Sequence, residues 1–118
     1  MVKTVEELTK IVAKAIDDKK ANNIQILDIR DLSVIADYFV ICNGNNERQV
    51  QAIVSEIREQ VHKHGYDVKG IEGAEEGRWV LVDLGDVVVH VFHREEREFY
   101  NIERLWSDAK MVSWEERA

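Results

Sequence analysis

The acidic residues of the segment Trp79–Phe92 (W-V-L-V-D-L-G-D-V-V-V-H-V-F) are the first candidates for chemistry in this chain. Sites that transfer phosphoryl or nucleotidyl groups hold magnesium with carboxylates that converge on one side of a strand. The spacing Asp-x-Asp achieves this because positions two apart share a face, and the chain contains no Asp-x-Asp. Asp83 and Asp86 instead straddle a predicted turn at Gly85, which they could cap or stiffen. We favour the turn role for Asp86.

The histidines form no predicted metal site. His62 and His64 are two apart on a predicted helix, so their side chains point in nearly opposite directions. His90 and His93 are three apart on a predicted strand and therefore face opposite sides of the sheet. The single Cys42 lies in an apolar run and is expected to be a small buried residue. We therefore expect neither a metal ion nor a cofactor.

A glycine-containing passage, Gly44–Asn46, precedes a predicted helix whose N-terminus could hold an anion. The passage lacks the spacing of a phosphate-binding loop or of a dinucleotide fingerprint, so a structural strand-to-helix turn is favoured. The sequence also shows no nucleophile with a recognisable base and orienting partner. These observations argue against an enzyme.

The hairpin predicted over Trp79–Phe92 offers a different clue. Val80, Val82 and Leu84 share one face of their strand, whereas Trp79, Leu81 and Asp83 share the other. If helices cover only one side of the sheet, the second set forms an exposed apolar patch with polar members, joined by His90 if it shares that face. Such patches mark protein-binding surfaces, and tryptophan is enriched at their energetic centres. The pattern alone also allows Trp79 to be ordinary core.

The elements that must position these residues follow from apolar periodicity and capping signals. They are a helix over 4–20, strands over 24–29 and 38–43, a helix that ends before Gly65, a strand over 66–71, the hairpin, and a helix over 94–106. The order α-β-β-α-β-β-β-α predicts an α+β fold with a mixed sheet of about five strands and packed helices. We expect one domain over residues 1–107 and a C-terminal tail over 108–118.

Composition narrows the possible partners. The net charge of −7 disfavours a broad nucleic-acid-binding face and favours encounter with a basic protein. One cysteine, no signal peptide and no apolar run of membrane-spanning length predict a cytoplasmic protein.

Three ordered signatures carry a family resemblance. The first is Ala36–Gly44 followed by Arg48–Val50, the second is Gly70–Gly73 followed by Trp79–Phe92, and the third is Arg97–Trp106. Together they resemble the ribosomal silencing factor family, also called Iojap-like, over almost the whole chain. Each signature alone would be weak, but the ordered combination is specific.

The resemblance implies a role without catalysis. Family members bind the large ribosomal subunit through the ribosomal protein uL-fourteen, block joining of the small subunit and so repress translation. An assembly role on the large subunit and a homodimer are also attributed to the family. Its fold is related to nucleotidyltransferases but lacks their metal-binding carboxylates. The resemblance places five residues of this chain on the partner-binding surface: Trp79, Leu81, Asp83, Glu72 and Tyr100.

Two other functions stay open from the sequence. One is a divergent nucleotidyltransferase-like enzyme that acts on a nucleotide, which the strand–Gly44–helix passage supports and the absent carboxylate pair opposes. The other is a homodimeric adaptor for some other partner, which an exposed sheet face or the tail with Trp114 would serve.

Overall fold

The computed structural model describes residues 4–32, 34, 36–95 and 110–112. Two helices begin at side-chain caps. α1 spans Val5–Asp18, and the hydroxyl of Thr4 accepts a hydrogen bond from the Glu7 amide at 3.0 Å. α2 spans Glu47–Lys63, and the side chain of Asn46 accepts one from the Gln49 amide at 2.8 Å. Each cap satisfies an amide that the helix itself leaves without a partner. The predicted helix starts are confirmed.

In the described part of the chain, six strands form one mixed sheet, so the predicted α+β class is confirmed. The sheet order is β3-β4-β5-β2-β1-β6, and β2 and β5 are the parallel neighbours among otherwise antiparallel pairs. The strands span Asn22–Asp28 (β1), Tyr38–Gly44 (β2), Gly70–Glu72 (β3), Trp79–Asp83 (β4), Val87–His93 (β5) and Lys110–Val112 (β6).

Some boundaries differ from the sequence prediction. β3 is limited to Gly70–Glu72, whereas a strand over 66–71 was expected. β1 begins at Asn22, before the expected start at residue 24, and Asn23 adopts a φ of 51° at a shift in the β1–β2 register. Asparagine tolerates this left-handed conformation and so allows an irregularity without ending the strand.

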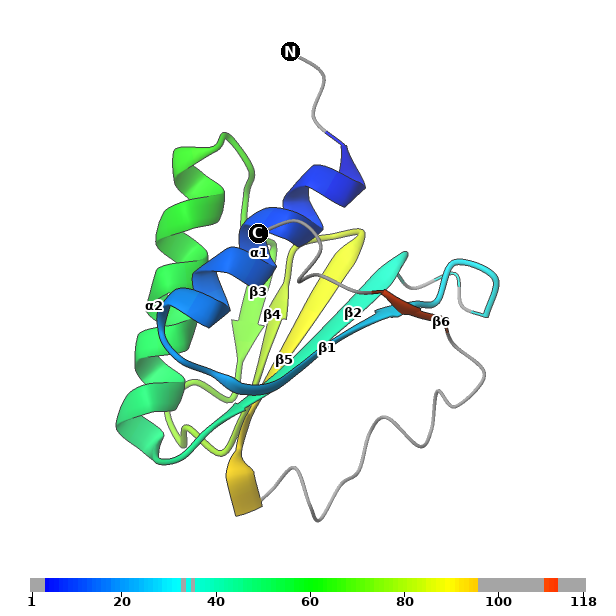
Figure 1. Cartoon of the computed structure of the whole chain (residues 1–118). Coiled ribbons are helices and arrows are strands. Elements are labelled where there is room, and N and C mark those ends of the chain that lie inside the picture. Colours follow the sequence, from blue (N-terminus) through cyan, green and yellow to red (C-terminus); the bar gives the residue numbers. More distant parts are fainter. Residues whose placement is uncertain (1–3, 33, 35, 96–109, 113–118) are drawn as a thin grey trace.

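The segment after β5 is described only in part. Arg94 and Glu95 are helical, and the rest of the helix expected over 94–106 lies outside the described residues. β6 comes from the segment 108–118 that was expected to be a tail, and it pairs with β1 at the edge of the sheet (Figure 1).

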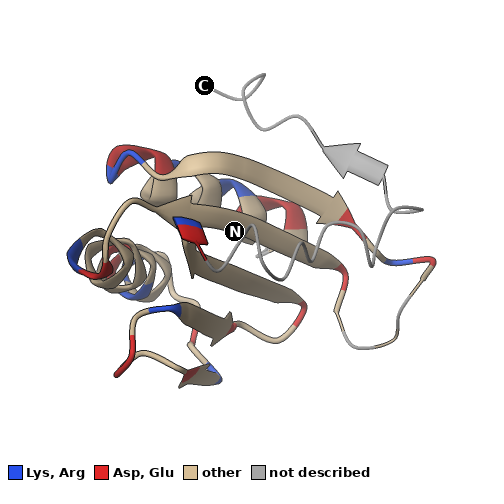
Figure 2. Ribbon diagram, turned by 90° about the horizontal axis from the view of Figure 1, so that it is seen from below, with Lys and Arg blue, Asp and Glu red and all other residues tan. Residues whose placement is uncertain are grey.

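Both helices pack on the same face of the sheet (Figure 1). The core beneath them is built from alternate strand positions, including Val80 and Val82 of β4 and Val87, Val89 and Val91 of β5. Lys, Arg, Asp and Glu gather on the helices, in loops and at strand ends, whereas the middles of the central strands carry none (Figure 2). Burial of the apolar core side chains beneath the helices is the main stabilising contribution to the fold.

A second apolar cluster lies on the opposite face of the sheet. Its buried members are Leu27, Ile29, Ala36, Phe39, Ile41, Val88 and Phe92, with Trp79 and Leu81 packed against them and partly exposed. β2 and β5 contribute to both clusters and are buried along their whole length. Cys42 is fully buried on the helix side, as expected. In the described part of the chain, neither helix is long and apolar enough to cross a membrane.

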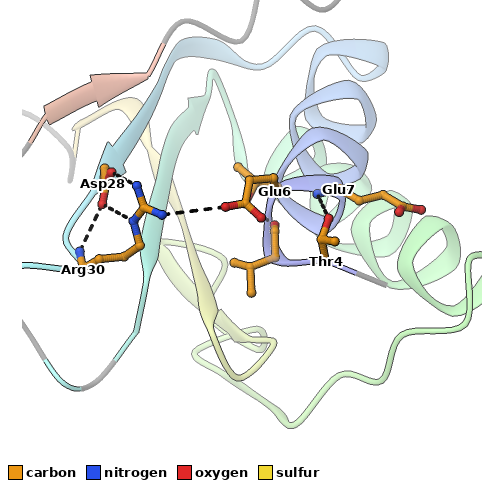
Figure 3. Close-up of polar contacts among 7 residues, drawn as sticks. Thr4, Glu6, Glu7, Asp28 and Arg30 are labelled. Atoms are coloured by element: carbon orange, nitrogen blue, oxygen red, sulfur yellow. Dashed lines mark hydrogen bonds and ion pairs between the residues drawn. The ribbon is translucent and has the colours of Figure 1, made fainter. Parts of the chain in front are cut away.

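An ion-paired cluster joins the end of β1 to the first turn of α1 (Figure 3). The carboxylate of Asp28 accepts hydrogen bonds from the Arg30 amide at 3.1 Å and from its guanidinium at 3.0 and 2.6 Å. The same guanidinium lies 3.7 Å from the Glu6 carboxylate. The hydrogen bond to Asp28 raises the pKa of Arg30 further above its ordinary value. The charged guanidinium thus lies between the carboxylates of Asp28 and Glu6.

The cap of α2 gives a direct test of how this helix begins. We expect Asn46→Ala to lower the free energy of unfolding by about 1 kcal/mol, because the Gln49 amide loses its side-chain acceptor. Ser55→Ala, at an exposed position within α2, should change stability by no more than a few tenths of a kcal/mol. Urea unfolding of both variants measures the difference. Equal stabilities would show that the cap contributes nothing.

Candidate partner-binding surface

The turn between β4 and β5 is closed by Asp83. Its carboxylate accepts a hydrogen bond from the Gly85 amide at 2.8 Å, and Gly85 has a φ of 94° that favours glycine. Asp86 acts through its backbone, since its carbonyl accepts hydrogen bonds from the amides of Asp37 and Tyr38. The Asp83 side chain therefore caps the turn, which is one of the two possibilities that the sequence offered. Asp86 instead connects the turn to the start of β2.

The strand β4 separates the two faces of the sheet residue by residue. Val80 and Val82 are fully buried toward the helices, whereas Trp79, Leu81 and Asp83 are partly exposed on the other face. Because Glu72 of β3 pairs directly with Leu81, it lies on the same face as Leu81. The structure therefore brings together four of the five residues expected at the partner-binding surface. Tyr100, the fifth, lies outside the described residues.

This face is buried at its centre and partly exposed toward β3. Leu27 on β1, Phe39 on β2 and Phe92 on β5 are buried, whereas Gln25 on β1 is partly exposed. Its positions on β4 are partly exposed, and Glu72 on the edge strand β3 is exposed. We define the β3–β4 surface as Glu72, Trp79, Leu81 and Asp83. It combines an aromatic and an aliphatic side chain with two carboxylates.

Trp79 lies where the buried cluster meets this surface. Its ring stacks on that of its cross-strand partner Phe92, with ring centroids 5.0 Å apart and an interplanar angle of 25°. Its indole nitrogen donates a hydrogen bond to Nδ1 of His90 at 3.2 Å. The sequence left open whether Trp79 is exposed or core, and the structure answers that it is both. Trp79 packs against the core cluster, and the residue as a whole is partly exposed.

Gly73 sets the path of the chain into β4. It adopts a φ of +81°, and a Cβ at this position would collide with the carbonyl oxygen of Trp79. The Gly77 amide donates to the Gly73 carbonyl at 3.2 Å, which closes the loop between β3 and β4. A glycine needed for close backbone approach cannot be recognised without the neighbouring segment that approaches it.

His90 is the buried polar residue behind Trp79. Only 4% of His90 is exposed. Its ring contacts the ring of Phe39 in an edge-to-face arrangement, with centroids 4.8 Å apart. Burial lowers the pKa of His90 to about 4, so the ring is neutral at pH 7. Because Nδ1 accepts the indole proton, the ring proton lies on Nε2, which has no hydrogen-bond partner among the described residues. The sequence assigned no role to this residue.

The passage from β2 to α2 is occupied by its own side chains. Gln49 accepts a hydrogen bond from the Asn45 amide at 2.7 Å and donates to the carbonyls of Lys19 and Lys20 at 3.1 and 3.0 Å. Asn46 caps the helix. These bonds confirm a structural strand-to-helix turn at Gly44–Asn46. Among the described residues, no group of three or more His, Cys, Asp or Glu could hold a metal ion.

A family model described as "Ribosomal silencing factor during starvation" matches residues 2–118. The chain is 56% identical over 107 residues to the ribosomal silencing factor of Bacillus subtilis, and the match covers 91% of each chain.

Two solved structures resemble the fold closely. A crystal structure from Bacillus halodurans superposes with a TM-score of 0.82 at 47% identity and covers 92% of this chain and 98% of that one. A crystal structure of a Chromobacterium violaceum protein gives a TM-score of 0.87 at 37% identity, with coverage of 89% and 88%. At 37% and 47% identity, both proteins resemble this chain in sequence as well as in fold.

The lowered pKa of His90 predicts a pH dependence of stability. Its folded-state pKa of about 4 lies below the ordinary value of about 6.5, so the unfolded chain takes up the proton first as the pH falls. The His90 contribution is therefore complete above about pH 6.5 and is lost toward pH 4, on the order of 3 kcal/mol in total, most of it above pH 4.5. Urea unfolding at pH 7 and pH 4.5 measures this loss.

His90→Phe is the matched control, because it removes the titrating group and leaves every other ionisable residue in place. The variant should lose less stability between the two pH values than the parent chain. Identical losses would show that His90 does not titrate in this window.

Proposed function

The chain belongs to the ribosomal silencing factor family, and from this membership we propose that it represses translation by binding the large ribosomal subunit and excluding the small one. The observation that carries the proposal is the family match over residues 2–118, together with 56% identity to a named silencing factor. We propose the ribosomal protein uL-fourteen as the contact on the large subunit. We propose that the protein acts in the cytoplasm, where the ribosomal subunits join.

The proposed mechanism is steric. A protein of this size docked on the joining face of the large subunit occupies space that the small subunit needs. No covalent bond forms or breaks, so the protein is not an enzyme and needs no cofactor. The degree of repression then depends on affinity and on the fraction of large subunits occupied.

We propose that the β3–β4 surface makes the contact. Trp79 and Leu81 supply apolar area that is accessible yet held against the core, which is the arrangement found at the energetic centres of interfaces. Glu72 and Asp83 add negative charge beside them, and the whole chain carries −7. This charge favours encounter with a basic ribosomal protein. Tyr100 belongs to the proposed surface through the family resemblance.

The nucleotidyltransferase alternative rested on the strand–Gly44–helix passage. There the Gln49 amide is bonded to the Asn46 cap, and the Asn45 amide to the Gln49 side chain. The passage therefore gives no support for a bound nucleotide. A homodimer of the free protein remains part of the proposal, and light scattering of the purified chain tests it.

The role of Trp79 as the apolar anchor can be tested by substitution. Trp79→Ala should weaken binding to purified large subunits by at least about 30-fold, because losing a central tryptophan of an interface costs about 2 kcal/mol or more. Co-sedimentation of the chain with large subunits over a range of concentrations measures the change.

Val82→Ala provides the matched control. It removes a fully buried side chain from the helix-facing side of the same strand, which should cost roughly 2 kcal/mol of stability and leave the β3–β4 surface intact. Unchanged binding by a folded Trp79→Ala variant would contradict the anchor role. Equal loss in both variants would attribute the effect to stability.

The contribution of negative charge on the β3–β4 surface can be tested at Glu72. Glu72→Lys should weaken binding about fivefold at low ionic strength, and the difference should shrink as salt is added, because exposed charges act mainly on encounter. Glu59→Lys makes the same charge change at an exposed position of α2, across the sheet. Equal effects from the two substitutions would show that only net charge matters and that the β3–β4 surface is not the contact.

A further inference from the structure

The hydrogen bond between Trp79 and His90 joins the proposed contact residue to a buried one on the next strand. His90 pairs with Leu81 in the register of β4 and β5, whereas Trp79 pairs with Phe92. The two residues are therefore diagonal neighbours on one face of the sheet, and Nε1 of Trp79 lies 3.2 Å from Nδ1 of His90. Diagonal pairs of this kind are within reach of aromatic side chains.

We propose that His90 is a positioning residue that fixes the orientation in which the indole of Trp79 meets its partner. The inference rests on the proposed function, because it concerns how the same surface is prepared for binding. It assigns His90 no contact with the partner itself. His90 acts through Trp79 alone.

The contacts of the indole show why a second fixed point matters. Stacking on Phe92 sets the plane of the ring, but a stacking contact does not by itself specify which indole atom faces inward. A hydrogen bond is directional, so the bond to Nδ1 determines which edge of the indole faces inward. The opposite edge is then presented outward in one orientation. A side chain ordered before binding loses less entropy when it binds.

The surroundings of His90 indicate that folding alone does not require a histidine there. The ring is buried among apolar groups, including Phe39, Phe92 and Ile41. Its Nε2 proton has no partner among the described residues, which is an unfavourable state for a buried donor. An apolar side chain of similar size would avoid that penalty. What a histidine supplies and an apolar residue cannot is the acceptor at Nδ1.

The neutral state of the ring keeps that acceptor available. Burial lowers the pKa of His90 to about 4, so Nδ1 retains its lone pair at neutral pH. The rings of Phe39 and Phe92 contact the His90 ring, and the indole N–H of Trp79 donates to its Nδ1. The bond to Trp79 therefore persists under the conditions in which ribosomes work.

The test compares two substitutions at one position in the full chain. His90→Leu removes the acceptor and keeps an apolar side chain, whereas His90→Asn keeps an acceptor, because its amide oxygen occupies nearly the place of Nδ1. We expect His90→Leu to bind large subunits about tenfold more weakly. Its free energy of unfolding should equal or exceed that of the parent chain. His90→Asn should recover most of the affinity.

A spectroscopic readout follows the hydrogen bond directly. The indole N–H signal of Trp79, identified by its loss in Trp79→Phe, should be protected from solvent exchange in the parent and in His90→Asn, and lose protection in His90→Leu. In the Trp79→Phe background, which lacks the donor, His90→Leu should weaken binding no further.

The outcomes separate this inference from the proposed function. If Trp79→Ala weakens binding but His90→Leu binds as the parent does, the positioning role is overturned and the proposed surface stands. The positioning role is also overturned if His90→Asn is as weak as His90→Leu, or if the two substitutions act independently. If Trp79→Ala binds normally, both the proposed surface and the positioning role fall.

Discussion

The parallel pairing of β2 with β5 is the constraint on which the rest of this structure depends. Both strands are buried along their full length, so each of their faces must be covered. The pairing runs from Tyr38 beside Val87 to Gly44 beside His93. At its start, the Asp86 carbonyl accepts hydrogen bonds from the amides of Asp37 and Tyr38. Since β5 is fixed at the centre, its hairpin partner β4 must lie one strand further out.

That position explains why the β3–β4 surface has its particular character. β4 is close enough to the centre for Val80 and Val82 to be fully buried beneath the helices, and close enough to the edge for Trp79 and Leu81 to remain partly exposed. An aromatic side chain there is supported by core residues such as Phe92 and still accessible. A strand at the centre would have buried Trp79, and an isolated edge would have left it without support. The fold thus leaves Trp79 and Leu81 partly exposed while they pack against the buried cluster.

Much of this architecture could be predicted from the sequence because the signals are local. Helical periodicity and the caps at Thr4 and Asn46 located both helices, and alternation around Gly85 located the hairpin. The same alternation placed Trp79 and Leu81 on one face. What could not be predicted depends on segments that are distant in sequence. His90 acquires its role from a diagonal neighbour eleven positions away, Gly73 from the approach of the Trp79 carbonyl, and the pairing of β1 with β6 from the far end of the chain.

The central claim is that occupancy of the large subunit by this chain prevents the small subunit from joining. The most direct measurement mixes purified subunits with increasing amounts of the chain and follows formation of joined ribosomes by sedimentation or light scattering. We expect saturable inhibition whose midpoint matches the affinity of the chain for large subunits alone. Its extent should fall when excess small subunit is present, because the two compete for one face. Saturated binding to large subunits with no reduction in joining would contradict the account.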